Sequence, residues 1–102
     1  MKVETKYNGV LELSAYMEYL VSSIFRLLPM YEKQEDWKKY LTALQIELSG
    51  LEELSNNVSF ISLISKLEGL FFIVDQPTFK KIVFDSITLV KQLKEGDENG
   101  TI

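Results

Sequence analysis

Residues 56–74, NNVSFISLISKLEGLFFIV, decide the fold that this chain is expected to adopt. Apolar residues recur along the stretch at steps of three and four, which predicts that they share one face of a helix: Phe60, Ile64, Leu67, Phe71 and Val74. Further apolar residues occupy the opposite side: Val58, Ile61, Phe72 and Ile73. A helix that is apolar nearly all round is either central in a core or covered by a partner.

A second helix is expected over residues 9–28. Its apolar residues repeat at the same steps: Val10, Leu13, Met17, Leu20, Ile24 and Leu27. Tyr16 and Tyr19 fall on the other side, where each hydroxyl can stay in water. This helix is expected to end before Pro29, because the residue before a proline is pushed out of helical geometry.

Residues 34–55 and 77–94 complete the set of expected helices. The first begins with Glu35 and Asp36, whose charges suit the positive end of a helix, and runs through Gly50, since an interior glycine costs only about 1 kcal/mol. The second has Pro77 in its first turn and is expected to end at Gly96. Residues 96–102 are polar and are expected to form a loose tail.

Residues 1–13 allow two interpretations. The pair Asn8-Gly9 is a strong signal for a two-residue hairpin turn, with residues 10–13 as the returning strand. The alternative makes residues 1–8 an arm and starts a helix at residue 9. We favour the arm and helix, because the apolar repeat begins at Val10 and an isolated hairpin is marginally stable.

These elements predict an all-α, single-domain antiparallel four-helix bundle with short loops, spanning residues 1–102. The chain has 46% hydrophobic and 25% charged residues, which is ordinary for a globular protein. A core this small only just outweighs the conformational entropy of the chain, so self-association would add useful burial.

The composition also limits which catalytic and metal-binding residues the chain can use. The chain has no cysteine and no histidine, which removes the thiolate nucleophile, the commonest general base and the commonest transition-metal ligands. Glu12, Glu18, Glu47, Glu68 and Asp85 fall on outer or flank positions, so no paired carboxylates are expected on an apolar seam. We therefore expect no catalytic residue, no cofactor and no metal; an enzyme would need an unexpected buried carboxylate in a cleft.

Charge and hydropathy bear on partners and location. The net charge is −4, which argues against nonspecific binding to nucleic acid or to an anionic membrane. The longest apolar run, residues 70–74, is far shorter than the roughly 20 residues of a membrane span. We therefore expect a soluble, cytoplasmic protein that has no small-molecule substrate.

Apolar residues on outward faces are the most informative feature for function. They are the candidate interaction surface: Ile46, Ile61, Phe72 and Phe84. A contiguous exposed cluster would mark an interface. If residues 58–74 lie at the centre of the bundle, however, Ile61 and Phe72 only complete the core.

The sequence therefore predicts a non-enzymatic helical protein–protein interaction module, self-associating as a homodimer and acting as a small adaptor, inhibitor or immunity-type protein. In size, acidic charge and helix number alone, the chain resembles bacteriocin immunity proteins and small phage-encoded regulators. The alternative is a small DNA-binding regulator that reads DNA with residues 77–94, where Lys80 and Lys81 lie near the start of the helix.

Overall fold

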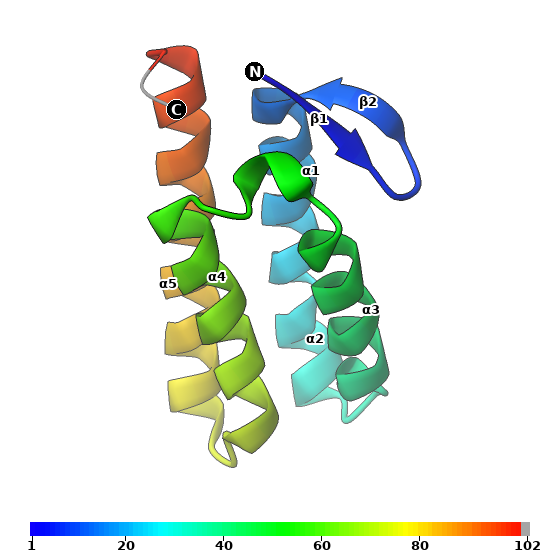
Figure 1. Cartoon of the computed structure of the whole chain (residues 1–102). Helices are drawn as coiled ribbons and strands as arrows, with labels where there is room; N and C mark the ends of the chain where they lie inside the picture. Colours follow the sequence, from blue (N-terminus) through cyan, green and yellow to red (C-terminus); the bar gives the residue numbers. More distant parts are fainter. Residues whose placement is uncertain (101–102) are drawn as a thin grey trace.

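Most of the chain is helical, and a short two-stranded sheet precedes the helices (Figure 1). The computed structural model describes residues 1–100. The elements follow in this order: β1 (Lys2–Thr5), β2 (Gly9–Glu12), α1 (Leu13–Phe25), α2 (Leu27–Glu32), α3 (Trp37–Ser49), the short 3-10 helix η1 (Glu52–Leu54), α4 (Val58–Gly69), the 3-10 helix η2 (Leu70–Phe72) and α5 (Gln76–Glu98).

Helix α5 packs along both α1 and α4, and α3 contacts α4 and α2. Figure 1 shows α3 and α4 in front of α1 and α5, with the hairpin beside the start of α1. The buried side chains form one cluster that draws on every helix and on Val3 of β1. The radius of gyration is 13.3 Å, which matches the value of about 13 Å for a compact chain of this length. Within the described part of the chain, no helix is long and apolar enough to cross a membrane.

The hairpin shows that the predicted arm over residues 1–8 and the helix start at residue 9 were wrong. Strands β1 and β2 pair antiparallel with Thr5 opposite Gly9, so the loop has three residues rather than two. Gly9 adopts a φ of +68°, a left-handed conformation that glycine tolerates best. The hairpin is not isolated, because Val3 and Thr5 are buried against the helices while Val10 faces solvent. Packing supplies the stability that the sequence alone did not reveal.

Two predicted helix ends were also wrong. Pro29 does not stop a helix but lies in the first turn of α2, where its missing N–H costs little. Helix α3 ends at Ser49 with Gly50 as its C-cap, although the prediction carried that helix on to residue 55. Leu51 and Leu54 are still buried, because the turn of η1 also directs them inward.

Helix α5 continues through Gly96 to Glu98, so the predicted end near residue 94 was wrong and residues 96–98 belong to the helix rather than to a tail. Residues 101–102 of the predicted tail lie outside the described residues. The extra turn has a structural role. The Asp97 side chain accepts a hydrogen bond of 3.2 Å from the backbone N–H of Ser14, at the start of α1. Helix α5 thus supplies a cap that α1 lacks in its own sequence.

Helix α4 begins and faces the core nearly as expected. Asn57 caps it by accepting a hydrogen bond of 3.0 Å from Phe60 N–H. The buried face is rotated from the predicted one, because Leu63 and Leu70 are buried while Ile64 and Phe71 are only half-buried. Helix α4 ends at Gly69, before the predicted end at residue 74, and Val74 is exposed.

Two glycine substitutions should change stability in opposite directions. Gly9→Ala forces a side chain into a left-handed conformation and should lower the free energy of unfolding by about 1–2 kcal/mol. Gly69→Ala adds a methyl group to helix α4 with no atom within 4 Å, and should raise that free energy by up to about 1 kcal/mol. Urea denaturation of both variants measures the two changes. Equal effects at the two sites would contradict the hairpin.

Candidate functional site

The four predicted interaction residues are all exposed. The exposed fractions are 55% for Ile46, 52% for Ile61, 80% for Phe72 and 41% for Phe84. The interpretation in which Ile61 and Phe72 complete the core is therefore wrong for the single chain. Their role in binding remains a prediction.

Ile46 and Ile61 lie near one groove, whereas Phe84 lies beside another helix. Phe72 is exposed in η2, after the end of α4. Phe84 of α5 packs edge-on against Phe25 of α1, with ring centroids 6.0 Å apart. Ile46 instead borders a groove between α3 and α4. Ile61 lies three residues before Ile64, which lines the same groove, so the two are neighbours on the surface of α4. The structure thus joins Ile46 with the region of Ile61 and separates both from Phe84.

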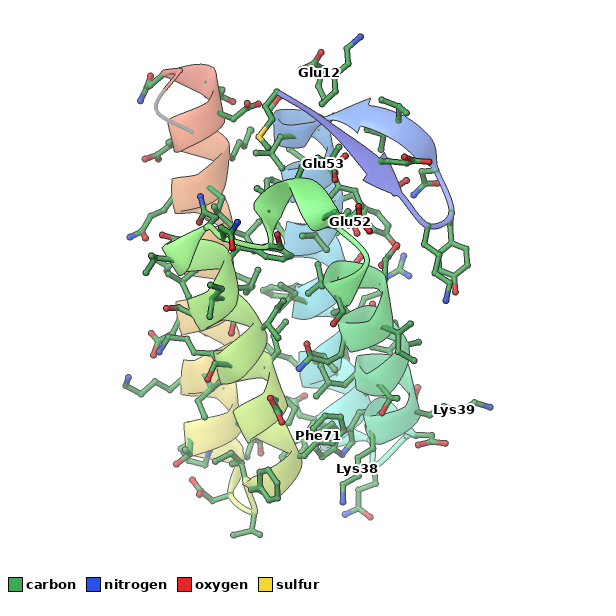
Figure 2. All side chains as sticks on the ribbon, in the orientation of Figure 1. Glu12, Lys38, Lys39, Glu52, Glu53 and Phe71 are labelled. Carbon is green, nitrogen blue, oxygen red and sulfur yellow. The ribbon has the colours of Figure 1, made fainter. Side chains whose placement is uncertain are left out.

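The groove between α3 and α4 has a volume of about 400 Å³. Phe71 closes one end, where its ring stacks on Trp37 at 6.1 Å between centroids. Figure 2 shows Phe71 at the same end of the molecule as Lys38 of α3. The Gln45 amide donates a hydrogen bond of 3.2 Å to the Ile64 carbonyl and ties the two helices together. We call the surface formed by Ile46, Ile61, Ile64 and Phe71 the α3–α4 face.

A second site lies on the other side of α3 and was missed by sequence reasoning. Glu47, which was expected on an outer position, is only 4% exposed. It lines a cleft of about 130 Å³ between α3, α1 and the hairpin loop. Tyr7, Tyr19 and Tyr40 line the cleft together with Glu47, and we call the site the tyrosine cleft. Ser23, Ala43 and Leu44 complete its lining.

Hydrogen bonds hold part of the cleft wall in place. The Tyr40 hydroxyl donates to the Ser23 carbonyl at 2.6 Å, which links α3 to α1. The Ser23 hydroxyl donates in turn to the Tyr19 carbonyl at 3.0 Å. Behind the cleft, Tyr16 is fully buried, so its predicted place on a solvent stripe was wrong. Within residues 1–100, the Tyr16 hydroxyl and Glu47 Oε1 are both buried and neither makes a hydrogen bond of good geometry. The two groups are nevertheless close enough for the Tyr16 hydroxyl to act on Glu47 as a donor.

Burial changes the acid–base properties of these groups. Burial raises the pKa of the Glu47 carboxyl above its ordinary value, and the nearby Tyr16 hydroxyl and Lys6 ammonium oppose that shift. Burial also raises the pKa of the Tyr16 phenol, and the Glu47 charge adds to the effect. The pKa of Tyr40 is raised as well, mainly by burial. The Tyr16 and Tyr40 phenols therefore keep their protons at neutral pH.

The sequence contains only a weak signal for the cleft. Tyr40 and Glu47 are seven residues apart, which places them on one flank of a helix. A glutamate next to an apolar seam is usually read as solvated, because charged residues are almost never buried unless paired. The partner strands and helices that bury Glu47 come from distant parts of the chain.

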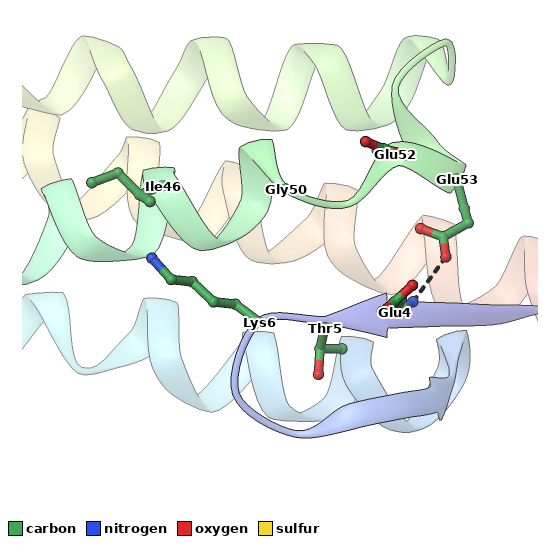
Figure 3. Close-up of a pocket in the computed structure, with 7 residues that line it drawn as sticks. All are labelled: Glu4, Thr5, Lys6, Ile46, Gly50, Glu52 and Glu53. Atoms are coloured by element: carbon green, nitrogen blue, oxygen red, sulfur yellow. Dashed lines mark hydrogen bonds between the residues drawn. The ribbon is translucent and has the colours of Figure 1, made fainter.

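Lys6, whose charge acts on Glu47, lines a cavity beside the hairpin. This cavity is lined by Glu4, Thr5, Lys6, Ile46, Gly50, Glu52 and Glu53. Figure 3 shows Lys6 extending toward Ile46 on α3, and Glu53 accepting a hydrogen bond from the Glu4 N–H at 2.8 Å. The Lys6 side chain therefore runs along the outer surface, although its charge still acts on Glu47.

The lysines proposed for DNA reading have partners within the chain. Lys81 pairs with Asp85 at 3.0 Å, and the Lys80 ammonium lies 6.0 Å from the centre of the Phe84 ring. The Asp85 charge reduces the positive field that phosphate binding requires.

Comparisons with known proteins give no family. No family model, curated protein or solved structure matches this chain. The α3–α4 face and the tyrosine cleft are accordingly the two starting points for function.

Glu47→Gln should stabilise the protein at neutral pH. Because the folded state raises the pKa of Glu47, the contribution of this residue to stability is greatest at low pH and falls as the carboxyl ionises. The amide cannot ionise, so the variant should melt above the wild type at pH 7, and the difference should shrink toward pH 4. Thermal melts across this range measure it. Glu95→Gln, at an exposed position of α5, is the control. A variant that melts lower at pH 7 would contradict a costly buried charge.

Proposed function

We propose that this chain is a non-enzymatic protein–protein interaction module that self-associates through the α3–α4 face. In this proposal an antiparallel four-helix bundle serves as the scaffold that presents the face. The main observation behind the proposal is that two protruding apolar side chains, Ile46 and Ile61, lie beside a groove between α3 and α4.

The chemistry of the face favours binding to another protein surface. Ile46 and Ile61 offer apolar area to water, and the half-buried Ile64 and Phe71 supply an apolar wall. Glu68 is the only charged residue among those that line the groove. Interface centres are depleted in charge and contain aromatic residues, and this face has low charge and one aromatic side chain, Phe71.

A second copy of the chain fits this surface best. A face with both protruding side chains and a groove is self-complementary, and a two-fold symmetric pair is the commonest assembly. Such a dimer would place Ile61 of one copy in the groove of the other, and the reverse. A standard interface needs about 800 Å² from each partner, a modest share of the 6052 Å² that this chain exposes.

Glu47 partly meets the condition that an enzyme would require, since it is a buried carboxylate in a cleft. Acid–base catalysis works best with a second titrating group whose pKa differs from the first. The neighbouring Tyr16 and Tyr40 phenols have raised pKa values and keep their protons. A lone carboxylate with aromatic walls supports binding more than turnover.

Ile61→Glu should prevent self-association. A charge placed at the centre of an apolar interface costs several kcal/mol, because it loses water without gaining a partner. Sedimentation equilibrium at micromolar concentration should give about twice the monomer mass of 11.8 kDa for the wild type and the monomer mass for the variant. Helicity by circular dichroism should not change, since Ile61 is exposed.

Phe84→Glu is the matched control. Phe84 is also an exposed apolar residue of a helix, but it lies beside Phe25 on another side of the molecule. The proposal expects this variant to remain dimeric. A dimer that survives Ile61→Glu and is lost with Phe84→Glu would move the interface away from α3 and α4. A monomeric wild type would end the proposal.

A further inference from the structure

We propose that the tyrosine cleft binds a primary alkylammonium ion, with the ammonium group donating hydrogen bonds to Glu47 and the alkyl chain lying among the tyrosine rings. This site is separate from the α3–α4 face, so its success or failure leaves self-association untouched. The same head group occurs on a free alkylamine and on a lysine side chain.

The first reason is an unmet hydrogen-bonding requirement. Glu47 is 4% exposed and forms no ion pair in residues 1–100. Its buried Oε1 makes no hydrogen bond of good geometry, although the Tyr16 hydroxyl lies nearby. A buried acceptor without a donor costs free energy, and a buried carboxylate without a cation costs more. An ammonium group in the cleft brings three N–H donors and a positive charge to the side of Glu47 that lines it. It therefore supplies the cation that the buried carboxylate lacks.

The second reason is the composition of the walls. Tyr7, Tyr19 and Tyr40 line the cleft from three different elements, the hairpin loop, α1 and α3. Cations are attracted to the faces of aromatic rings, and rings grouped around an acidic residue are a suitable surround for an ammonium group. Ala43 and Leu44 add apolar area for an alkyl chain.

The third reason is size. The cleft has a volume of about 130 Å³. A cavity of about 150 Å³ is known to hold benzene, so a molecule of similar size fits here. A four-carbon ammonium ion has a comparable number of heavy atoms, whereas a bulky cation would not enter.

Lys6 is the nearest cation of the chain itself, but it does not fill the cleft. No ion pair joins Lys6 to Glu47 among the described residues, and the Lys6 side chain extends along the outer surface toward Ile46 (Figure 3). The Lys6 ammonium lies 5.4 Å from the centre of the Tyr7 ring. The place beside Glu47 is thus left for a cation from outside the chain.

The test is titration of the full chain with n-butylammonium, followed by amide chemical shifts in NMR spectra. Shifts should concentrate on residues 40–47 and on Tyr19. The neutral molecule of the same size, 1-butanol, should bind about tenfold more weakly, because it cannot pair with the carboxylate. Equal binding of the two molecules would overturn the proposal, and so would an absence of shifts at these residues.

The variant Glu47→Gln tests whether the carboxylate is needed to bind the ammonium ion, without disturbing the fold. This variant should be folded and stable, yet its affinity for n-butylammonium should fall about tenfold, while Glu95→Gln should bind as the wild type does. An unchanged affinity in Glu47→Gln would overturn the role of the carboxylate. Titration with lysine blocked at both backbone ends distinguishes the source of the ligand. Binding as tight as that of n-butylammonium indicates a lysine side chain of a partner, and weaker binding indicates a free amine.

Discussion

The packing of α5 against α1 and α4 is the interaction on which the rest of the structure depends. Phe79, Val83, Val90 and Leu93 of α5 are buried along its length. Ser86 lies fully buried among them, and its hydroxyl donates to the Ile82 carbonyl within the same helix at 2.8 Å. A small residue at this point leaves room for the neighbouring helices, and its hydroxyl needs no partner from them. The last turn of α5 then caps α1 through Asp97.

Helix α3 forms part of both candidate sites. At one end, the Trp37 ring contacts Phe79 of α5 at 5.0 Å and Phe71 at 6.1 Å between centroids. Along its length α3 is tied by single hydrogen bonds, from Gln45 to α4 and from Tyr40 to α1. Its leucines, Leu41, Leu44 and Leu48, are buried in the common core. The α3–α4 face opens on one side of α3 and the tyrosine cleft on the other.

The sequence predicted the features that depend on local chemistry. The helical class and the burial of Leu13, Met17 and Leu20 follow from side-chain spacing. Two of the failures involve contacts between distant residues. The hairpin forms because Val3 is buried by the helices, and α5 extends past Gly96 to a position where Asp97 meets α1. Periodicity within one segment contains no information about such contacts.

The two candidate sites show the same difference between features set by local sequence and features set by contacts between distant residues. Helical position predicted outward places for Ile46 and Phe84 but left Ile61 and Phe72 open between core and surface. The packing of the helices was needed to show that all four are exposed and that Phe84 lies beside Phe25. Glu47 was assigned to solvent because glutamate is rarely buried. Its burial results from Tyr16 of α1 and from the hairpin loop, which are 31 and about 40 residues away in the chain.

The most direct measurement of self-association is the concentration dependence of amide chemical shifts between micromolar and millimolar protein. Association through the α3–α4 face predicts shifts that concentrate on residues 42–49 and 61–71 and spare the amides around Phe84. Spectra that do not change with concentration would contradict self-association. Changes centred on α1 and α5 would contradict the assignment of the face.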